Sequence, residues 1–427
     1  MRVTNMKLIS KLLAASLVFG TYAVSMPSFA DVPSDQLEEV ERRKKERGGQ
    51  VLGTRIGKKI GAAYELFSEE KVKEALEMLL ELEPKGAFDK AYVNRFIGNM
   101  YAGMEGKAKE AIDRLKKAEA ADELPFNDHA GTLKLLADLS LQEQAYAEAL
   151  VYYRKFIDFS LDQDPNVYLR MSNALYEMKK YEEAIKPARR AIELFETPNQ
   201  NPYVIIMASY YEQKKYKEAT KAVEELVKVF PEEAKWWTQL GSFYMSTEDF
   251  ERGLSTFELA YKQGFLETET QVKQLAQLYS TNGIPFKSAQ VQEKHIKSGL
   301  ISESKQSLSV LASTYRNAKE FLKAAEYYAK AGKFADDGEL YKDQGNMLLA
   351  IERNSEAVKA FNLALDKGVK RKGVVYMAIA EAHFYERQWK QAHKAIKLAM
   401  KEKNTAKSAK SWEAYIRESA ERDGVNL

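Results

Sequence analysis

Four histidines are the side chains of this chain best suited to bind a metal ion or to transfer protons at neutral pH. They are His129, His295, His383 and His393. Two of them, His383 and His393, are expected on consecutive helices, but no His-Glu-x-x-His motif is present. Cysteine is absent, which excludes disulfides, cysteine-bound zinc and thiol catalysis. No Gly-x-Ser-x-Gly motif is found either. We therefore expect no catalytic residue, no metal site and no cofactor.

Three glycines near the start, Gly53, Gly57 and Gly61, stand beside Lys58 and Lys59. A phosphate-binding loop has four residues between its glycines and a serine or threonine after the lysine. Here the gap is three residues, and a second lysine follows the first. The pattern therefore favours a stripe of small residues on a helix that packs against the first repeat, not a nucleotide site.

The elements that must position any site recur with a period of about 35 residues. One unit contains Trp237, Leu240, Gly241, Tyr244 and Phe257, which is a helix–turn–helix pattern of large, small and aromatic residues. The small residue of each first helix recurs ten times, at Ala63, Gly98, Ala137, Ser172, Met207, Gly241, Ala276, Ala312, Gly345 and Ala380.

One repeat is interpreted as irregular. In the repeat of Ala276 we read residues 282–285 as an insertion before Ala289, with a turn distorted by Pro285. After the last repeat, residues 405–422 predict one more helix, with Trp412, Tyr415 and Ile416 on one face, which would cover the end of the array.

This spacing resembles that of tetratricopeptide repeat (TPR) proteins from about Lys59 to Lys403. The resemblance implies an all-α, right-handed superhelical solenoid of about ten helix–turn–helix repeats with a C-terminal capping helix. It also implies a protein that binds other proteins or peptides. We divide the chain into a signal peptide (1–30), a charged leader (31–50), divergent N-terminal repeats (51–125), the main repeat array (126–404) and the capping helix with its tail (405–427).

In this architecture the first helix of each repeat faces a concave groove. Its expected groove positions are rich in neutral amides and hydroxyls, which both donate to and accept from a peptide backbone. The same positions hold Lys273, Gln277, Ser280 and Gln306 in later repeats. The predicted partner-binding residues are Asn166, Asn173, Tyr176, Asn201, Tyr211, Gln239 and Ser242.

The first thirty residues are typical of a cleaved export signal. Arg2, Lys7 and Lys11 precede an apolar stretch that ends at Ser28-Phe29-Ala30, although a retained membrane anchor is the alternative. The chain has 65 basic and 62 acidic residues, and the signal contains three basic residues and no acidic one. Cleavage therefore leaves a balanced chain without the positive charge that nucleic-acid or anionic-membrane binding requires. We expect a periplasmic protein with no stable membrane insertion.

Two short stretches carry a narrower resemblance. Residues 54–66, and Gly283-Ile284-Pro285 before Ala289, are similar to periplasmic TPR proteins that accompany TonB energy-transduction systems of Gram-negative bacteria. This resemblance implies a partner among TonB-system components and a role in outer-membrane uptake of iron complexes. The alternative is an envelope-assembly or secretion factor, a chaperone that holds outer-membrane or pilus proteins. An enzyme of the cell wall with the repeats as scaffold is a third, weaker hypothesis.

Overall fold

The computed structural model describes residues 34–427, and over this range the chain has 22 helices and no strand. The predicted signal and its cleavage site lie outside the described residues. The described chain divides into two compact units, one up to residue 205 and one from residue 206, and the division falls within helix α10 (Gln200–Glu212). No helix of the described range is long and apolar enough to cross a membrane.

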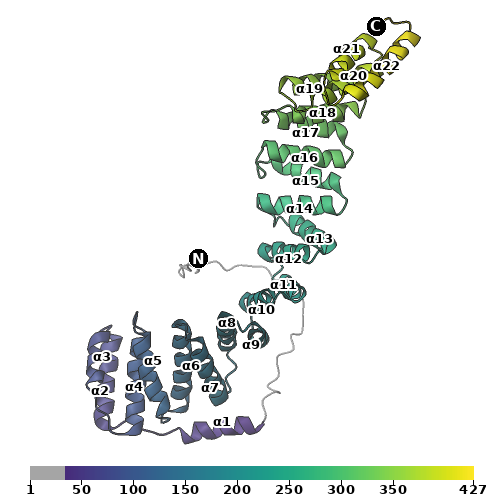
Figure 1. Cartoon of the computed structure of the whole chain (residues 1–427). Coiled ribbons are helices and arrows are strands. Elements are labelled where there is room, and N and C mark those ends of the chain that lie inside the picture. Colours follow the sequence, from purple (N-terminus) through teal and green to yellow (C-terminus); the bar gives the residue numbers. More distant parts are fainter. Residues whose placement is uncertain (1–33) are drawn as a thin grey trace, which may run out of the picture. The chain divides into compact units, whose positions relative to one another are not determined.

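In the first unit, helices α2 to α9 pack chiefly against their neighbours along the chain (Figure 1). Its helices before α10 are α1 (Ser34–Glu46), α2 (Thr54–Ser68), α3 (Val72–Leu80), α4 (Ala87–Ala102), α5 (Ala108–Ala120), α6 (Phe126–Gln142), α7 (Tyr146–Ser160), α8 (Pro165–Glu177) and α9 (Tyr181–Leu194).

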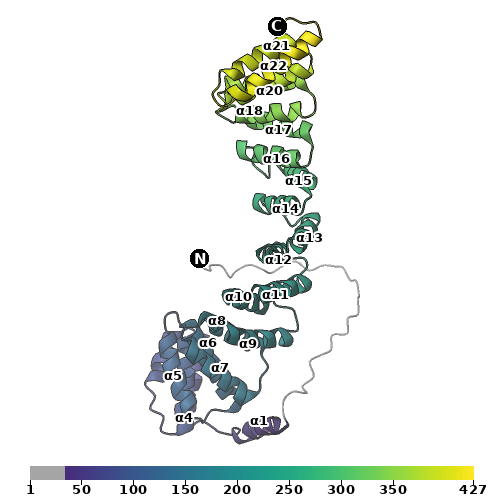
Figure 2. The ribbon, with the colours of Figure 1, turned by 45° about the vertical axis from the view of Figure 1, so that its right-hand side comes forward.

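The second unit continues the same pattern of consecutive helix pairs (Figure 2). Its helices after α10 are α11 (Tyr216–Val229), α12 (Ala234–Ser246), α13 (Phe250–Lys262), α14 (Glu269–Thr281), α15 (Pro285–Lys297), α16 (Lys305–Asn317), α17 (Phe321–Gly332), α18 (Glu339–Leu349), α19 (Asn354–Asp366), α20 (Lys372–Tyr385), α21 (Trp389–Met400) and α22 (Ala406–Arg422).

Helices α2 to α21 form the ten pairs that the repeat period predicts, and α22 packs against α21 as the predicted capping helix. The all-α repeat fold is thus confirmed. The cap is held by polar contacts as well as apolar ones. Nε2 of His393 on α21 lies 2.9 Å from a carboxylate oxygen of Glu413 on α22, and the indole N–H of Trp389 donates to Asp423 at 3.1 Å.

Small residues allow close contact where the pattern predicts it. A Cβ added at Gly241 on α12 would overlap the ring of Phe257 on α13, and one at Gly345 on α18 would overlap Phe361 on α19. Both rings are fully buried. Because glycine is the residue without a Cβ, the close packing of each pair depends on it.

Two predictions about local structure are wrong. No residue is inserted before α15: Ser288 stands twelve residues after Ala276, as Ala184 stands twelve after Ser172. The turn is ordinary, since Pro285 takes the first helical position, where its missing N–H costs nothing. Ser288, and not Ala289, is therefore the small residue of this second helix.

The glycine stripe also differs from its prediction. A Cβ on Gly61 would meet nothing within 4 Å, so the exposed edge of α2 is not a close helix contact. Gly53 precedes α2, and its backbone N–H donates to a carboxylate oxygen of Asp89 at 3.0 Å.

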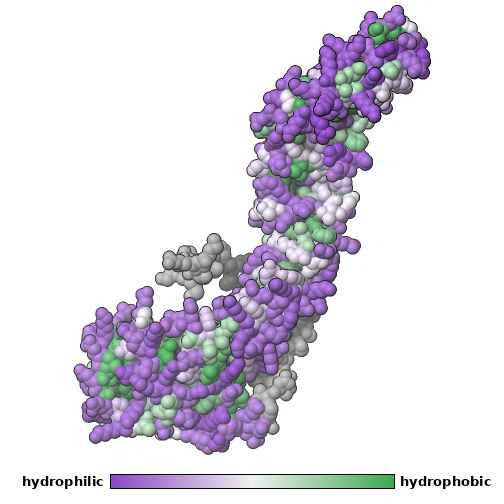
Figure 3. Space-filling view, in the orientation of Figure 1, coloured by the Kyte–Doolittle hydropathy of each residue, from purple (hydrophilic) through white to green (hydrophobic). Residues whose placement is uncertain are grey.

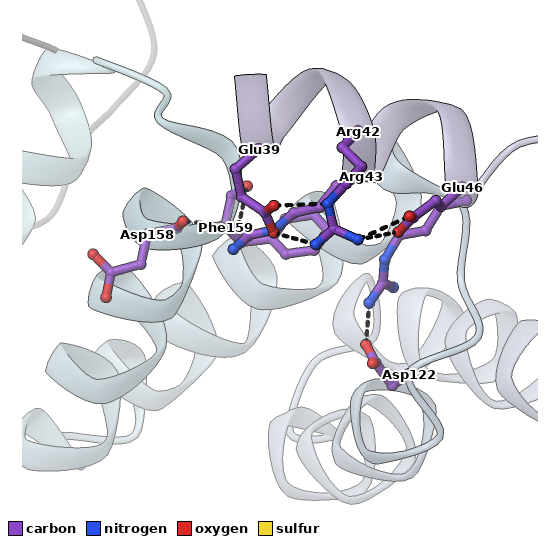
Figure 4. A network of polar contacts seen from close by, with 8 residues as sticks. Glu39, Arg42, Arg43, Glu46, Asp122, Asp158 and Phe159 are labelled. Atoms are coloured by element: carbon purple, nitrogen blue, oxygen red, sulfur yellow. Dashed lines mark hydrogen bonds and ion pairs between the residues drawn. The ribbon is translucent and has the colours of Figure 1, made fainter. Parts of the chain in front are cut away.

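The charged leader forms α1, which lies across the ends of later helices of the first unit (Figure 4). Arg43 donates to the backbone carbonyl of Phe159 at 3.1 Å, and Arg47 donates to that of Leu124 at 3.2 Å and pairs with Asp122. Both guanidinium groups lie over the Phe159 ring, 5.6 and 5.0 Å from its centroid. These cation–π contacts fix a helix whose own residues are almost all polar.

Candidate functional site

The predicted partner-binding residues fall on both units. Asn166, Asn173, Tyr176 and Asn201 belong to the first unit, whereas Tyr211, Gln239 and Ser242 belong to the second.

In the first unit, two of the predicted asparagines make local hydrogen bonds near the start of their helices. Asn166 donates from its backbone and its side chain to Asp164, at 2.8 and 3.1 Å, in the N-terminal cap of α8. The backbone N–H of Asn201 donates to the side chain of Asn199 at 2.9 Å. Asn173 is exposed on α8, and the ring of Tyr176 lies 5.4 Å from that of Tyr181.

In the second unit, the structure brings the other three predicted residues together. Tyr211, Gln239 and Ser242 line a cavity of about 270 Å³ between α10 and α12, which we call the α10–α12 groove. Phe243 forms part of its wall, and the ring of Tyr211 packs edge-on against it at 5.9 Å. Tyr211 remains 52% exposed, so its phenol is accessible to a ligand.

A larger cavity of about 450 Å³ lies between α14, α15 and α16, and we call it the α14–α16 groove. It includes the expected groove residues Lys273, Gln277, Ser280 and Gln306. Figure 3 shows residues of intermediate hydropathy gathered over this part of the second unit. The ammonium of Lys273 pairs with Glu269 at 2.5 Å, which reduces the charge that it presents to the cavity.

The floor of the α14–α16 groove is polar, and the sequence interpretation missed it. The hydroxyl of Ser288 donates to the carbonyl of Ala276 at 2.6 Å and accepts from Ser280 at 2.9 Å. Nε2 of Gln292 donates to the hydroxyls of Ser288 and Thr314, at 3.1 and 3.2 Å. The available signal was a serine and a glutamine where the repeat pattern places small or apolar residues.

Glu293, the neighbour of Gln292, fastens three helices on another face of α15. Its carboxylate accepts from the phenols of Tyr315 and Tyr327, the latter at 2.8 Å, and from the ammonium groups of Lys297 and Lys323 at 2.6 and 2.9 Å. Burial raises the pKa of Glu293, but these hydrogen bonds outweigh it and hold the pKa far below its usual value. The groove therefore rests on a rigid support.

The histidines do not form a shared site. Nδ1 of His383 lies 2.7 Å from the Gln388 side chain, whereas His393 contacts Glu413. His295 contacts the phenol of Tyr261 at 2.9 Å. Within residues 34–427, no group of three or more histidine or carboxylate side chains is placed to hold a metal ion.

Two family models match the middle of the chain. The model of anaphase-promoting complex, cyclosome, subunit 3 matches residues 142–226, and a tetratricopeptide repeat model matches residues 209–264. Neither describes an enzyme. No curated protein sequence matches the chain.

Several solved structures are similar in part. The MamA protein is 20% identical, with a TM-score of 0.34, over 41% of this chain and 91% of that one. MamA from Desulfovibrio magneticus RS-1 is 19% identical, with a TM-score of 0.33, over 41% and 94%. YrrB, a TPR protein with an unusual peptide-binding site, is 20% identical, with a TM-score of 0.32, over 44% and 94%. Similarity at this level does not extend to ligands or partners.

Proposed function

We propose that the chain is a noncatalytic tetratricopeptide-repeat scaffold that binds an extended segment of a partner protein. The observation that carries the proposal is the lining of the two grooves of the second unit. Neutral donors and acceptors from successive first helices surround open cavities there, among them Gln239, Ser242, Gln277 and Gln306.

The chemistry of these side chains suits an extended peptide. Each residue of such a segment has one N–H donor and one C=O acceptor that no helix or sheet satisfies. Amides such as Gln239 and Gln277 offer both functions, so they pair with either group of the backbone. Tyr211 adds an exposed ring that contributes apolar contact area together with a polar tip.

We propose further that the protein works in the periplasm and supports TonB-dependent uptake of iron complexes. The support is the sequence alone: the export signal that ends at Ser28-Phe29-Ala30 and the narrower resemblance of residues 54–66. A mature protein that begins at Asp31 and is released by osmotic shock is the expected result. A membrane-bound chain with an intact N-terminus would contradict this location.

Site-specific photo-crosslinking in living cells tests the binding surface and the partner together. A photoreactive phenylalanine replaces Gln239 or Gln277, and the matched control replaces Lys221, an exposed residue of α11 outside both cavities. We expect one shared partner at the two glutamine positions and none at Lys221. Equal capture at all three positions, or capture only at Lys221, would reject the grooves as the binding surface.

The identity of the captured protein separates the functional alternatives. A component of an energy-transducing inner-membrane complex, or a receptor that it drives, supports the TonB role. Many different outer-membrane or pilus proteins would instead indicate a chaperone. As a second measurement, Tyr211→Ala combined with Gln239→Ala is expected to slow growth on scarce iron while helicity and melting stay unchanged.

A further inference from the structure

We propose that the α14–α16 groove is a specificity pocket for one aromatic side chain that carries a hydrogen-bond donor, a tyrosine or a tryptophan of the bound peptide. This inference rests on the proposed function, since it names the side chain that the scaffold selects. It follows from the orientation of one buried amide, from the walls around that amide and from the charges that the pocket lacks.

The hydrogen bonds of the floor fix the orientation of the Gln292 amide. The hydroxyl protons of Ser288 and Thr314 are used, because they donate to the carbonyls of Ala276 and Val310 at 2.6 and 2.8 Å. Both hydroxyls therefore act as acceptors toward Gln292, and its NH2 group must face them. The amide oxygen consequently faces away from these two hydroxyls.

That oxygen is an unused acceptor in a nearly buried side chain. Gln292 is 7% exposed and lines the cavity, and no group of the described chain donates to its Oε1. The oxygen remains accessible to water, so a ligand that displaces this water must supply a hydrogen-bond donor in its place. The pocket thus presents one acceptor at its floor, which calls for a donor on the ligand.

The walls select the rest of the ligand. Ala276, Ile296, Ile301 and Val310 give the cavity apolar sides, and its volume of about 450 Å³ is of the size that holds a ring system. No lining residue is acidic, so a lysine or arginine would enter without a countercharge. A carboxylate would face the Gln292 oxygen, acceptor against acceptor, and the lining cation Lys273 is already paired with Glu269 at 2.5 Å. A neutral aromatic ring with an O–H or N–H meets each of these conditions.

The polar floor is a local departure from the repeat. At the position of Ser288, the other second helices from α7 to α21 carry alanine or glycine. At the position of Gln292 they carry alanine, a β-branched residue or an aromatic residue, as in Val223 of α11 and Phe257 of α13. Ser288 and Gln292 thus depart from the repeat pattern in the same helix, and their side chains contact each other. This is the pattern expected of a binding site formed by specific side chains.

The test measures binding of three small probes to the full chain. The probes are N-acetyl-L-tyrosinamide, N-acetyl-L-tryptophanamide and N-acetyl-L-phenylalaninamide, and the readout is the methyl NMR shifts of Ile296 and Ile301. We expect the first two to bind roughly three- to tenfold more tightly than the phenylalanine probe, which lacks the donor.

Two variants and a control locate the effect. Gln292→Met keeps the size of the side chain and removes the acceptor, so all three probes should bind within about twofold of one another. Val310→Phe fills the cavity from a residue that is 44% exposed, so it should abolish binding even if Gln292→Met folds poorly. The control is Gln290→Met, an exposed residue of the same helix, which should leave the preference unchanged.

Equal binding of the tyrosine and phenylalanine probes by the unaltered chain would overturn the proposal. A preference that survives Gln292→Met, or no shift at either isoleucine, would also overturn it. None of these results touches the scaffold function, which is judged by the crosslinking partner. Conversely, a tyrosine preference without any crosslinked partner would retain the pocket and reject the scaffold role.

Discussion

The α10–α12 and α14–α16 grooves are built on the same repeat plan, yet they differ in volume and chemistry. At two matching positions of the second helix, the first groove has Ala219 and Val223 and the other has Ser288 and Gln292. On the following first helix, a large aromatic residue, Phe243, corresponds to Thr314. The cavity of the first groove is about 270 Å³ and that of the second about 450 Å³. A helix–turn–helix unit of the same length can therefore form either an apolar packing surface or a polar pocket, depending on the side chains at these three positions.

The supports behind the two grooves differ in the same direction. In each, a glutamate on the second helix accepts from a tyrosine on the next first helix: Glu224 from Tyr244 at 2.6 Å, and Glu293 from Tyr315. Burial, together with the phenol–carboxylate contact, raises the pKa of Tyr244 to about 12. Glu293 has three further donors, whereas Glu224 has one more, Arg252 at 3.4 Å. The groove with the larger cavity thus has the glutamate with more hydrogen-bond donors.

The largest expected effect comes from removing the charge of Glu293. Glu293→Gln keeps the side-chain shape but removes the charge that four donors share, in a carboxylate that is only 13% exposed. We expect it to lower the free energy of unfolding by about 3 kcal/mol, against about 1 kcal/mol for the matched change Glu224→Gln. Urea denaturation of the two variants measures the difference. Equal losses would show that the extra donors contribute nothing.

Acid should reduce the stability that the Glu293 carboxylate contributes to the unaltered chain. The pKa of Glu293 in the folded chain lies below its ordinary value of 4.5, so its stabilising contribution is complete above that pH. The contribution is lost as the pH falls below 4.5 toward the folded pKa. The stability gap between the unaltered chain and Glu293→Gln should therefore be constant from pH 7 to about 5 and narrow at lower pH. A stability gap between the two proteins that stays constant down to pH 3 would contradict this role of the ionised Glu293.

The next effect in size tests the close helix contact behind the α10–α12 groove. Gly241→Ala places a Cβ against the fully buried ring of Phe257, so it should cost about 1–3 kcal/mol. Gly131→Ala on α6 is the matched control, because nothing lies within 4 Å of its added Cβ. That control should stabilise by about 0.5–1 kcal/mol, since alanine favours a helix more than glycine does. Amide exchange would show whether the loss stays near α12 and α13, as expected of a repeat array.

How far the sequence predicts this molecule depends on the kind of contact. The ten helix pairs follow from a periodic pattern, because small and large residues recur at the same spacing in successive pairs, and the capping helix follows from the apolar face of residues 405–422. The polar pocket floor does not follow from the predicted pattern, because a distorted turn at Pro285 would place Ala289, and not Ser288, at the small position of the second helix. The two residues differ by one position, which is about 100° around a helix.

Other contacts leave no periodic signal at all. The docking of α1 depends on Arg43 and Arg47 over Phe159, residues more than a hundred positions apart in the chain. Asn166 illustrates a different limit of prediction from the sequence. Its type and position fit a groove residue, but Asp164, two residues earlier, takes its side-chain donor for the helix cap. The residue type at a position predicts which hydrogen-bond donors and acceptors its side chain has. The contacts of the neighbouring turn determine which of these remain available to a partner.

The smallest expected effect concerns two corresponding turns, one between α10 and α11 and one between α14 and α15. Between the paired helices, Lys214 and Gly283 occupy the same left-handed position, with φ of 60° and 74°, and the next residue donates back to the first helix in both turns. Nothing lies within 4 Å of a Cβ added at Gly283, so Gly283→Ala changes only backbone preference. It should cost about 1 kcal/mol, because an L side chain disfavours this conformation. Lys214→Gly should change stability by less than about 0.5 kcal/mol, since relief of that strain is offset by the greater freedom of glycine in the unfolded chain. Thermal melts of both variants measure these shifts. A loss at Lys214→Gly as large as that at Gly283→Ala would mean that the lysine side chain itself stabilises its turn, and the two turns would then not be equivalent.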